Sequence, residues 1–265
     1  MKLILTYGIP FLLIILGGQA GTEGTIVGVL LAIAYLILIN LRVIYLVNGS
    51  KALKKGETAK GIDLYNKAMK GRIDAEYVVY ASYVFLRYGY EKECADTIKK
   101  AEAIKNLSPK QKKELTITKA LLAWRNKNFA EAEELIKEVH EKMPDSTTYA
   151  HLGFIYLEEG KFDEAYEFNK EALEYNDSDA SILDNMAMSH YHKGEIDEAI
   201  ALYDKIFKST IRFPVIYYNY ALCLIKKGEK EKAIDALNDA LHYPFSHIAA
   251  VSKDEVMKKL DEIKE

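Results

Sequence analysis

The chain has 265 residues, 49% of them hydrophobic, and a formal net charge of −3 at pH 7. This length allows a large buried core, and the balanced charge argues against a strongly basic nucleic-acid-binding surface, so we expect no nucleic-acid partner. The two cysteines, Cys94 and Cys223, lie far apart in the sequence and predict buried free thiols rather than a disulfide or metal framework.

The first 50 residues are expected to form a membrane anchor. Residues 25–47 are apolar, with only Asn40 and Arg42 as strongly polar members. A helix of this length spans about 34 Å at ~1.5 Å per residue, which is enough to cross a hydrocarbon core of about 30 Å. The pattern therefore predicts a transmembrane helix at 25–47.

A second apolar run at residues 3–18 has two interpretations. It is short and contains Pro10, but it predicts a first transmembrane helix that forms a hairpin with residues 25–47. The alternative is a cleaved signal peptide, with Lys2 as its basic region and small residues at 18–20 as the cleavage site. Both interpretations remain open at this point.

Basic residues predict the orientation of the anchor. The loop before residue 25 carries only Glu23, whereas four basic residues flank the distal end of the helix. Because basic flanks stay in the cytoplasm, we expect a cell-membrane protein whose residues 51–265 are cytoplasmic, with membrane lipid among its partners. The four residues are Arg42, Lys51, Lys54 and Lys55.

Gly24, Gly28 and Ala32 form a stripe of small residues at four-residue spacing within the predicted transmembrane helix. Such a stripe is typical of close helix packing, either against the first helix or against a second copy of the protein. The plainer interpretation is that glycine and alanine are common in membrane helices. If the stripe has a packing role, we therefore expect either contact with the first helix or self-association through these three residues.

A strict 34-residue repeat covers residues 146–247. A glycine recurs at this interval, and so does an alanine five positions later. This period predicts stacked helical hairpins, in which the glycine ends the first helix and the alanine lies on the second. The positions are Gly160, Gly194 and Gly228, and Ala165, Ala199 and Ala233.

The repeats resemble the tetratricopeptide repeat (TPR) family. The first helix matches that family through Tyr149, Leu152, Gly153 and Tyr156. The resemblance implies a right-handed α-solenoid whose first helices line a concave groove. Three positions depart from the family pattern: His190 and Leu224, where the family favours Tyr, and Asn169, where it favours an aromatic residue.

The expected fold class is all-α, with an N-terminal transmembrane helix or helical hairpin followed by a right-handed TPR-like α-solenoid and a C-terminal capping helix. Residues 51–265 form the repeat domain in this interpretation. The final helix begins at the capping sequence Ser252-x-x-Glu255. The expected parts are divergent hairpins at 51–145, regular repeats at 146–179, 180–213 and 214–247, and a cap at 252–265.

Signatures of catalysis are missing from the sequence, which contains no Gly-Lys-Ser/Thr of a P-loop, no HExxH, no CxxC and no Gly-x-Ser-x-Gly. His190 and His192 are two positions apart on a predicted helix and point in different directions. We therefore expect no enzyme, no metal and no cofactor.

The 34-residue register selects candidate groove residues on the first helices. Asn185 and Asn219 occupy the same place in successive repeats, and His151 occupies it one repeat earlier. An amide donates and accepts hydrogen bonds, so this ladder suits the backbone of an extended peptide. The alternative for each is an exposed helical Asn without a role. The predicted groove residues are His151, Phe154, Leu157, Glu158, Asp184, Asn185, Met188, His192, Tyr218, Asn219, Leu222 and Lys226.

Charge is distributed unevenly along the chain. Residues 51–128 hold 18 Lys/Arg against 9 Asp/Glu, whereas residues 129–200 hold 5 against 19. The acidic stretch favours a protein or peptide partner with basic and apolar character. In the TPR family that the repeats resemble, a carboxylate clamp binds chaperone C-terminal tails and needs Lys/Arg and Asn at five places. One of these five places matches here, which argues against such a clamp. These places are Ala150, Phe154, Asn185, Val215 and Asn219.

From these features we expect a membrane-anchored TPR scaffold or adaptor that mediates protein–protein interactions through a concave groove. The alternative is a signalling module that senses a peptide or ligand and couples it to the membrane helices. An open groove favours the first function. A helix that continues unbroken from residue 25 to about residue 54 keeps the second available.

Overall fold

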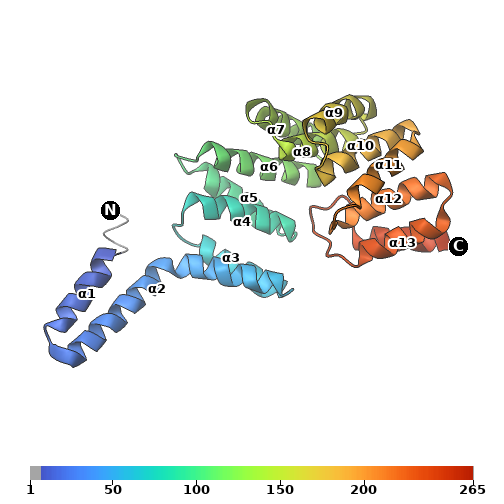
Figure 1. Cartoon of the computed structure of the whole chain (residues 1–265). Helices are drawn as coiled ribbons and strands as arrows, with labels where there is room; N and C mark the ends of the chain where they lie inside the picture. The colour runs from blue at the N-terminus through green and yellow to red at the C-terminus, as the bar shows by residue number, and fades with distance from the viewer. Residues whose placement is uncertain (1–6, 265) are drawn as a thin grey trace. The chain divides into compact units, whose positions relative to one another are not determined.

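A computed structural model describes residues 7–264, and all regular structure within them is helical (Figure 1). The expected all-α class is confirmed. The chain divides into two compact units, Met1–Val78 and Val79–Glu265, each with its own internal packing. The start of the run predicted at 3–18, Lys2 of the alternative signal peptide, and Glu265 lie outside the described residues.

The N-terminal unit begins with a helical hairpin made of α1 (Ile9–Gly18) and α2 (Gly21–Lys54), which is visible in Figure 1. The chain reverses at Gly21, whose φ of +82° is readily accessible only to glycine. Close contact between the two helices depends on small residues. A Cβ atom at Gly28 would lie 2.5 Å from the backbone oxygen of Leu13, and one at Gly24 would clash with Gly17.

This packing assigns a role to part of the small-residue stripe. Gly24 and Gly28 face α1 of the same chain. Of the two expectations for the stripe, the structure therefore shows packing against the first helix.

Helix α2 is long and apolar enough to cross a membrane. Its large side chains are exposed, as Leu38 (67%) and Ile26 (61%) illustrate, which distinguishes it from the buried core helix of a soluble protein. Length and composition of this kind fit either a membrane anchor or a signal sequence. The helix continues past residue 47 to Lys54 without a break.

The last turns of α2 pack closely on α3 (Thr58–Met69). A Cβ atom at Gly49 would lie 2.8 Å from the ring of Tyr65, a side chain that is fully buried. The hydroxyl groups of Ser50 and Tyr65 are 2.8 Å apart and share a hydrogen bond. The end of α2 and α3 are therefore joined by a tight and partly polar contact.

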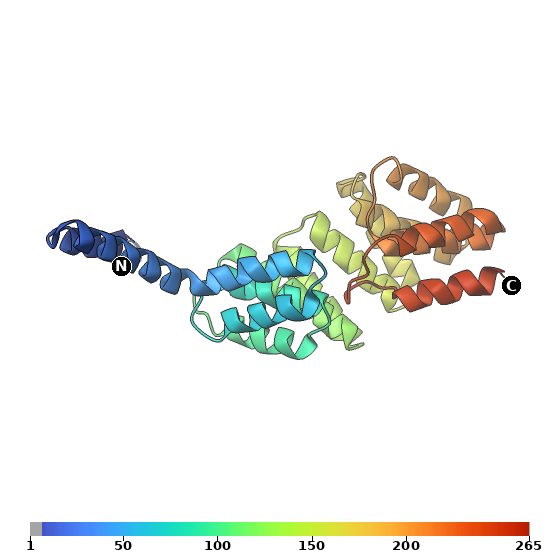
Figure 2. The same ribbon diagram turned by 90° about the horizontal axis from the view of Figure 1, so that it is seen from below.

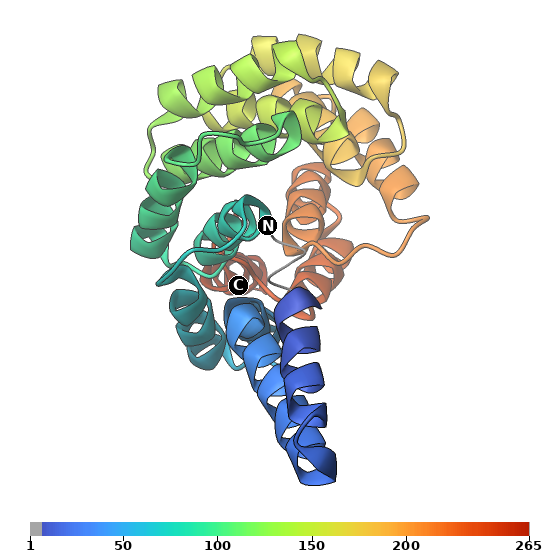
Figure 3. The same cartoon turned by 90° about the vertical axis from the view of Figure 1, so that its left-hand side faces the viewer.

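The second unit is a series of antiparallel helical hairpins. Helix α4 begins before the division between the units and continues into the second one. Figure 3 shows the helices of residues 79–265 following one another along a curved path, from teal through yellow to red. The helices are α4 (Ala75–Arg87), α5 (Glu91–Glu102), α6 (Pro109–Arg125), α7 (Phe129–Lys142), α8 (Ser146–Glu158), α9 (Phe162–Tyr175), α10 (Ala180–Lys193), α11 (Ile196–Ile206), α12 (Pro214–Lys227), α13 (Lys230–Leu241) and α14 (Lys253–Lys264).

The residues that define the 34-residue period have the predicted structural roles. Each repeat glycine follows the first helix of its hairpin with a positive φ, and each repeat alanine is completely buried between helices. The glycine φ values are +76° at Gly160, +81° at Gly194 and +86° at Gly228, and the alanines with no exposed surface are Ala165, Ala199 and Ala233.

Asn169 departs from the family pattern because its site is polar. The side chain is fully buried, and its Nδ2 donates to Ser189 Oγ at 3.0 Å. Space for it is provided by Gly153, where any Cβ atom would collide with the Asn169 amide. A small residue on α8 and a hydroxyl on α10 thus allow an amide to replace an aromatic ring on α9.

Both cysteines are buried and free, as predicted. Burial raises the pKa of each thiol to about 12, so neither forms a reactive thiolate at neutral pH.

Helix α14 closes the C-terminal end of the repeats, as the capping sequence predicted. The backbone N–H of Glu255 donates to Ser252 Oγ at 3.2 Å, and the Ser252 N–H donates to the Glu255 carboxylate at 2.7 Å. Val256 and Leu260 pack into the core formed with α12 and α13, and Figure 2 shows these last helices, in orange and red, stacked together.

Candidate partner-binding groove

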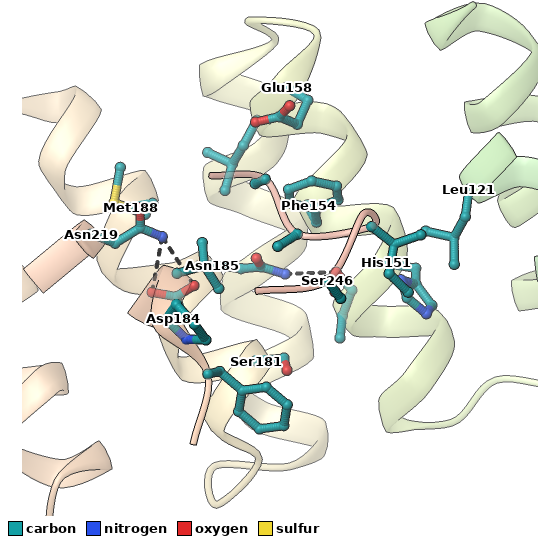
Figure 4. A pocket seen from close by; sticks show the side chains of 18 of the residues that line it. Leu121, His151, Phe154, Glu158, Ser181, Asp184, Asn185, Met188, Asn219 and Ser246 are labelled. Carbon is teal, nitrogen blue, oxygen red and sulfur yellow. Dashed lines mark hydrogen bonds between the residues drawn. The ribbon is translucent and has the colours of Figure 1, made fainter. Parts of the chain in front are cut away.

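A cavity of about 410 Å³ lies on the side of the repeats formed by the first helices α8, α10 and α12. We call it the groove pocket. Side chains from several helices converge on it in Figure 4. Tyr83 and Arg87 of α4 and Leu121 of α6 extend its wall. A cavity of this size is within the range of sites that hold a small molecule or one or two large side chains.

Most of the predicted groove residues line this pocket, and three do not. Tyr218, Leu222 and Lys226 are absent from its wall. Tyr218 instead packs against the core shared by α12, α13 and α14, because the capping helix covers that part of α12. The predicted residues that line the pocket are His151, Phe154, Leu157, Glu158, Asp184, Asn185, Met188, His192 and Asn219.

Sequence reasoning missed one wall of the pocket. This wall comes from the loop between α13 and α14 and includes Pro244, Ser246 and Ile248. The available signal was weak: residues 243–251 contain no Lys, Arg, Asp or Glu. A second missed group surrounds the start of α12 and comprises Arg212, Phe213, Pro214 and Val215.

The two predicted ladder residues hold successive first helices together. Asn185 Nδ2 donates to the backbone oxygen of Ala150 at 2.7 Å. Asn219 Nδ2 donates to both carboxylate oxygens of Asp184, at 3.2 and 3.1 Å. Each amide thus reaches 35 residues back along the chain. Their NH₂ groups therefore serve the fold.

Asp184 is the polar centre of the pocket wall. Its carboxylate is only 8% exposed and accepts a hydrogen bond from the Tyr203 hydroxyl at 2.7 Å, in addition to those from Asn219. Burial raises the pKa of Asp184 to about 6, and the two hydrogen-bond donors partly oppose this shift.

Other ionisable groups in the wall are also pushed toward their neutral forms. Burial lowers the pKa of His151 to about 4, so its ring is uncharged at neutral pH. Burial also raises the pKa of Glu158, whose carboxylate accepts a hydrogen bond from Trp124 Nε1 at 3.0 Å. The wall is therefore less charged than its composition suggests.

Aromatic contacts fix two side chains at the pocket. Phe154 packs edge-to-face on Trp124, with 5.0 Å between ring centroids. His192 stacks on Phe162 of the preceding helix, α9, with 3.9 Å between ring centroids, and partial burial lowers the pKa of His192. Both rings are held by neighbours, so the apolar part of the wall is largely preorganised.

Sequence comparison identifies known repeats in this unit. Models of the tetratricopeptide repeat match residues 146–179 and 185–247. The chain is 28% identical over 178 residues to a TPR repeat-containing protein of Methanocaldococcus jannaschii, covering 64% of this chain and 31% of that protein. It therefore spans about a third of the length of this curated relative.

Solved structures support the same fold. A tetratricopeptide repeat protein from Parabacteroides merdae superposes with a TM-score of 0.70 at 13% identity, covering 97% of this chain and all of the other. A thermophilic TPR protein of Thermus thermophilus gives 0.56 at 16% identity, covering 72% of this chain and 99% of the other. Pseudomonas aeruginosa PilF gives 0.54 at 18% identity, covering 82% and 97%.

Proposed function

We propose that this chain, which carries tetratricopeptide repeats within residues 146–247, is a membrane-anchored scaffold that holds a protein partner in its groove pocket. TPR proteins generally mediate protein–protein interactions as scaffolds. The observation that carries the proposal is the groove pocket itself, a preorganised and largely apolar cavity formed on three successive first helices.

The partner suited to this pocket presents an apolar anchor. Phe154, Leu157 and Met188 supply apolar surface, and buried apolar anchors contribute most of the affinity at interfaces. The acidic stretch 129–200 favours basic residues next to that anchor. Carbonyl oxygens of Asn185 and Asn219 are suited to accept hydrogen bonds from the partner's backbone.

Membrane attachment is supported by the hairpin of α1 and α2. Helix α2 exposes its apolar side chains, carries Lys51 and Lys54 in its last turn and is followed directly by Lys55, the arrangement expected for a membrane helix with a cytoplasmic C-terminal side. We accordingly place the protein in the cell membrane and its repeats in the cytoplasm.

A non-enzymatic role agrees with how the pocket uses its ionisable groups. The Asp184 carboxylate accepts hydrogen bonds from Tyr203 and Asn219, and the Glu158 carboxylate accepts one from Trp124. Carboxylates held in this way act as fixed acceptors that position neighbouring helices. They are poorly placed to exchange protons with a substrate.

A second candidate function is signalling through the membrane helices. It is favoured by α2, which is continuous from Gly21 to Lys54 and packs tightly on α3 through Gly49 and Tyr65. In this version the partner is a peptide or ligand, and the tight α2–α3 contact transmits the effect of binding.

The scaffold proposal can be tested by placing a charge in the pocket. Proximity labelling in the native cell identifies neighbours of the full-length protein, and the affinity of a purified neighbour is then measured. Met188→Lys should weaken that binding about 30-fold, as expected for loss of a hot-spot contact of about 2 kcal/mol. Met143→Lys makes the same substitution at an exposed methionine outside the pocket wall, with the same change of charge, and should leave the affinity nearly unchanged. Equal affinity for both variants would place the binding site elsewhere.

A further inference from the structure

The loop between α13 and α14 crosses the concave side of the repeats. We call residues 244–250 the strap. Five of its seven residues line the groove pocket, opposite the side chains of α8 and α10. Figure 4 shows the strap ribbon passing close to Phe154, with Ser246 and His151 nearby. The strap residues in the wall are Pro244, Ser246, Ile248, Ala249 and Ala250.

One residue fastens the strap to the far end of the same unit. The backbone N–H of His247 donates to the backbone oxygen of Arg87 at 2.9 Å. His247 Nε2 and Glu91 Oε1 lie 2.6 Å apart, which joins residues separated by 156 positions in the sequence. The ring rests over Gly89, where a Cβ atom would lie 3.4 Å from Nδ1.

Apolar packing holds the strap at its two ends. Phe245 packs on the core of α12, α13 and α14, and Val251, just beyond the strap, is buried in the same core. Between these points, the hydrogen bonds that link the strap to other helices among residues 7–264 are the two of His247. Its side chain and that of Glu91 are partly exposed, at 29% and 36%, so solvent competes with their contact. The strap is therefore held in place by few and individually weak bonds.

The chemistry of the strap resembles that of a bound peptide. It has no acidic residue, no lysine and no arginine, and it is irregular in structure between two helices. Pro, Ile and Ala side chains contribute to the pocket wall while Ser246 adds a hydroxyl. The cavity between the strap and these helices has room for one or two large side chains, so a longer partner segment that ran across α8 and α10 would have to displace the strap.

We propose that the strap is an internal occupant of the partner groove, and that the partner which displaces it presents a segment of similar chemistry: short, without regular secondary structure, apolar and rich in small residues. This inference rests on the proposed scaffold function. The contacts of His247 with Glu91 and Arg87 stabilise the closed state, and binding becomes a competition between the strap and the partner segment.

Opening of the strap can be measured without a partner. Met188→Cys places a thiol in the pocket wall, and its rate of labelling by a maleimide is followed in full-length protein in lipid nanodiscs. Glu91→Ala removes the acceptor of the His247 ring. Loss of one hydrogen bond of ordinary strength should speed labelling about 2- to 13-fold. Glu93→Ala, in the same first turn of α5, is the matched control, and protein with only Cys94 and Cys223 gives the background. Equal rates in both variants would overturn the closed-strap proposal.

The competition can be measured by locking the strap. A Cβ atom at residue 89 would lie 3.8 Å from Cβ of His247, which matches the separation in disulfides. The double variant Gly89→Cys and His247→Cys can therefore be compared with itself in oxidised and reduced form, so the backbone strain at residue 89 is the same in both. The probe is a fluorescent synthetic peptide with the sequence of residues 243–251.

The reduced protein should bind this peptide at least about 10-fold more tightly than the oxidised one. Only molecules with an open strap can bind the peptide, and the disulfide keeps the strap closed. Equal affinities, or no binding to the reduced form, would overturn the proposal. A failure here leaves the scaffold function standing if Met188→Lys still weakens binding of the native partner. If Met188→Lys has no effect, the scaffold proposal itself fails.

Discussion

Asn219 on α12 donates to both carboxylate oxygens of Asp184 on α10, at 3.2 and 3.1 Å. One repeat earlier, the Asn at the equivalent position also bonds to the preceding first helix: Asn185 Nδ2 donates to the backbone oxygen of Ala150. Side chains at one register position therefore join three consecutive first helices. Substituting either Asn affects the stability of the repeats as well as the surface offered to a partner.

Asn219→Ala should destabilise the protein by about 1–3 kcal/mol, because it leaves the buried Asp184 carboxylate with the Tyr203 hydroxyl as its remaining described donor. Chemical denaturation of the full-length protein measures the loss. Asn238→Ala, on α13 and outside the pocket wall, serves as the control and should change stability by less than about 0.5 kcal/mol. Equal effects at the two positions would show that the Asn219 bond does not stabilise the repeats.

Acid should destabilise the protein through His151. Burial lowers the folded-state pKa of His151 to about 4, whereas the ring titrates near 6.5 when unfolded. The neutral ring therefore contributes stability that is present above pH 6.5 and is lost as the pH falls toward 4, up to about 3 kcal/mol. Asp184 acts in the opposite direction over this range, because its folded-state pKa is raised to about 6.

Comparing variants separates the two titrations. His151→Gln should lose less stability than the wild type between pH 6.5 and pH 4.5, and Asp184→Asn should lose more. Denaturation midpoints measured across this range provide the check. Identical pH profiles for the wild type and His151→Gln would contradict a partly buried histidine that the fold keeps neutral.

Ala199→Trp should destabilise the repeats by roughly 1–3 kcal/mol or more, because Ala199 has no exposed surface and the indole has no space between the helices. Ala201→Trp provides the control, since Ala201 is exposed on the same helix. Thermal unfolding of both variants is compared with the wild type. A Trp at 199 that is tolerated as well as one at 201 would show that this interface is not tightly packed.

Topology is tested by reporters fused to the C-terminus. Because basic residues gather at the C-terminal end of α2, a reporter that functions only in the cytoplasm should be active, and one that functions only after export should be inactive. Activity of the exported reporter would reverse the proposed orientation.

The repeats could be predicted from the sequence because their determinants are local. A glycine that ends a helix with positive φ and an alanine at a helix–helix contact each constrain a few neighbouring residues, and the 34-residue spacing multiplies this signal. The same register gave nine of the residues that line the pocket. It could not show that the NH₂ groups of Asn185 and Asn219 are used inside the fold, since this depends on the distance between successive helices.

The strap and the capped part of α12 depend on longer-range geometry. Whether residue 247 meets residue 91 is decided by the summed rotations of all the intervening hairpins, and no short pattern encodes that sum. Tyr218 was expected in the groove because its register position is correct, but α14 packs over it. Sequence periodicity describes one repeat and its neighbours, and it says little about where the ends of the array lie.

The bond between His247 and Glu91 also bears on how the protein unfolds. A linear array of repeats frays from its ends, since each terminal hairpin has only one neighbour. Here the segment that follows the last hairpin is attached to α5, so loosening of the C-terminal end must break a contact with the opposite end of the unit. Residues 79–265 should therefore melt in a single cooperative transition, in which damage to either end lowers the stability of both.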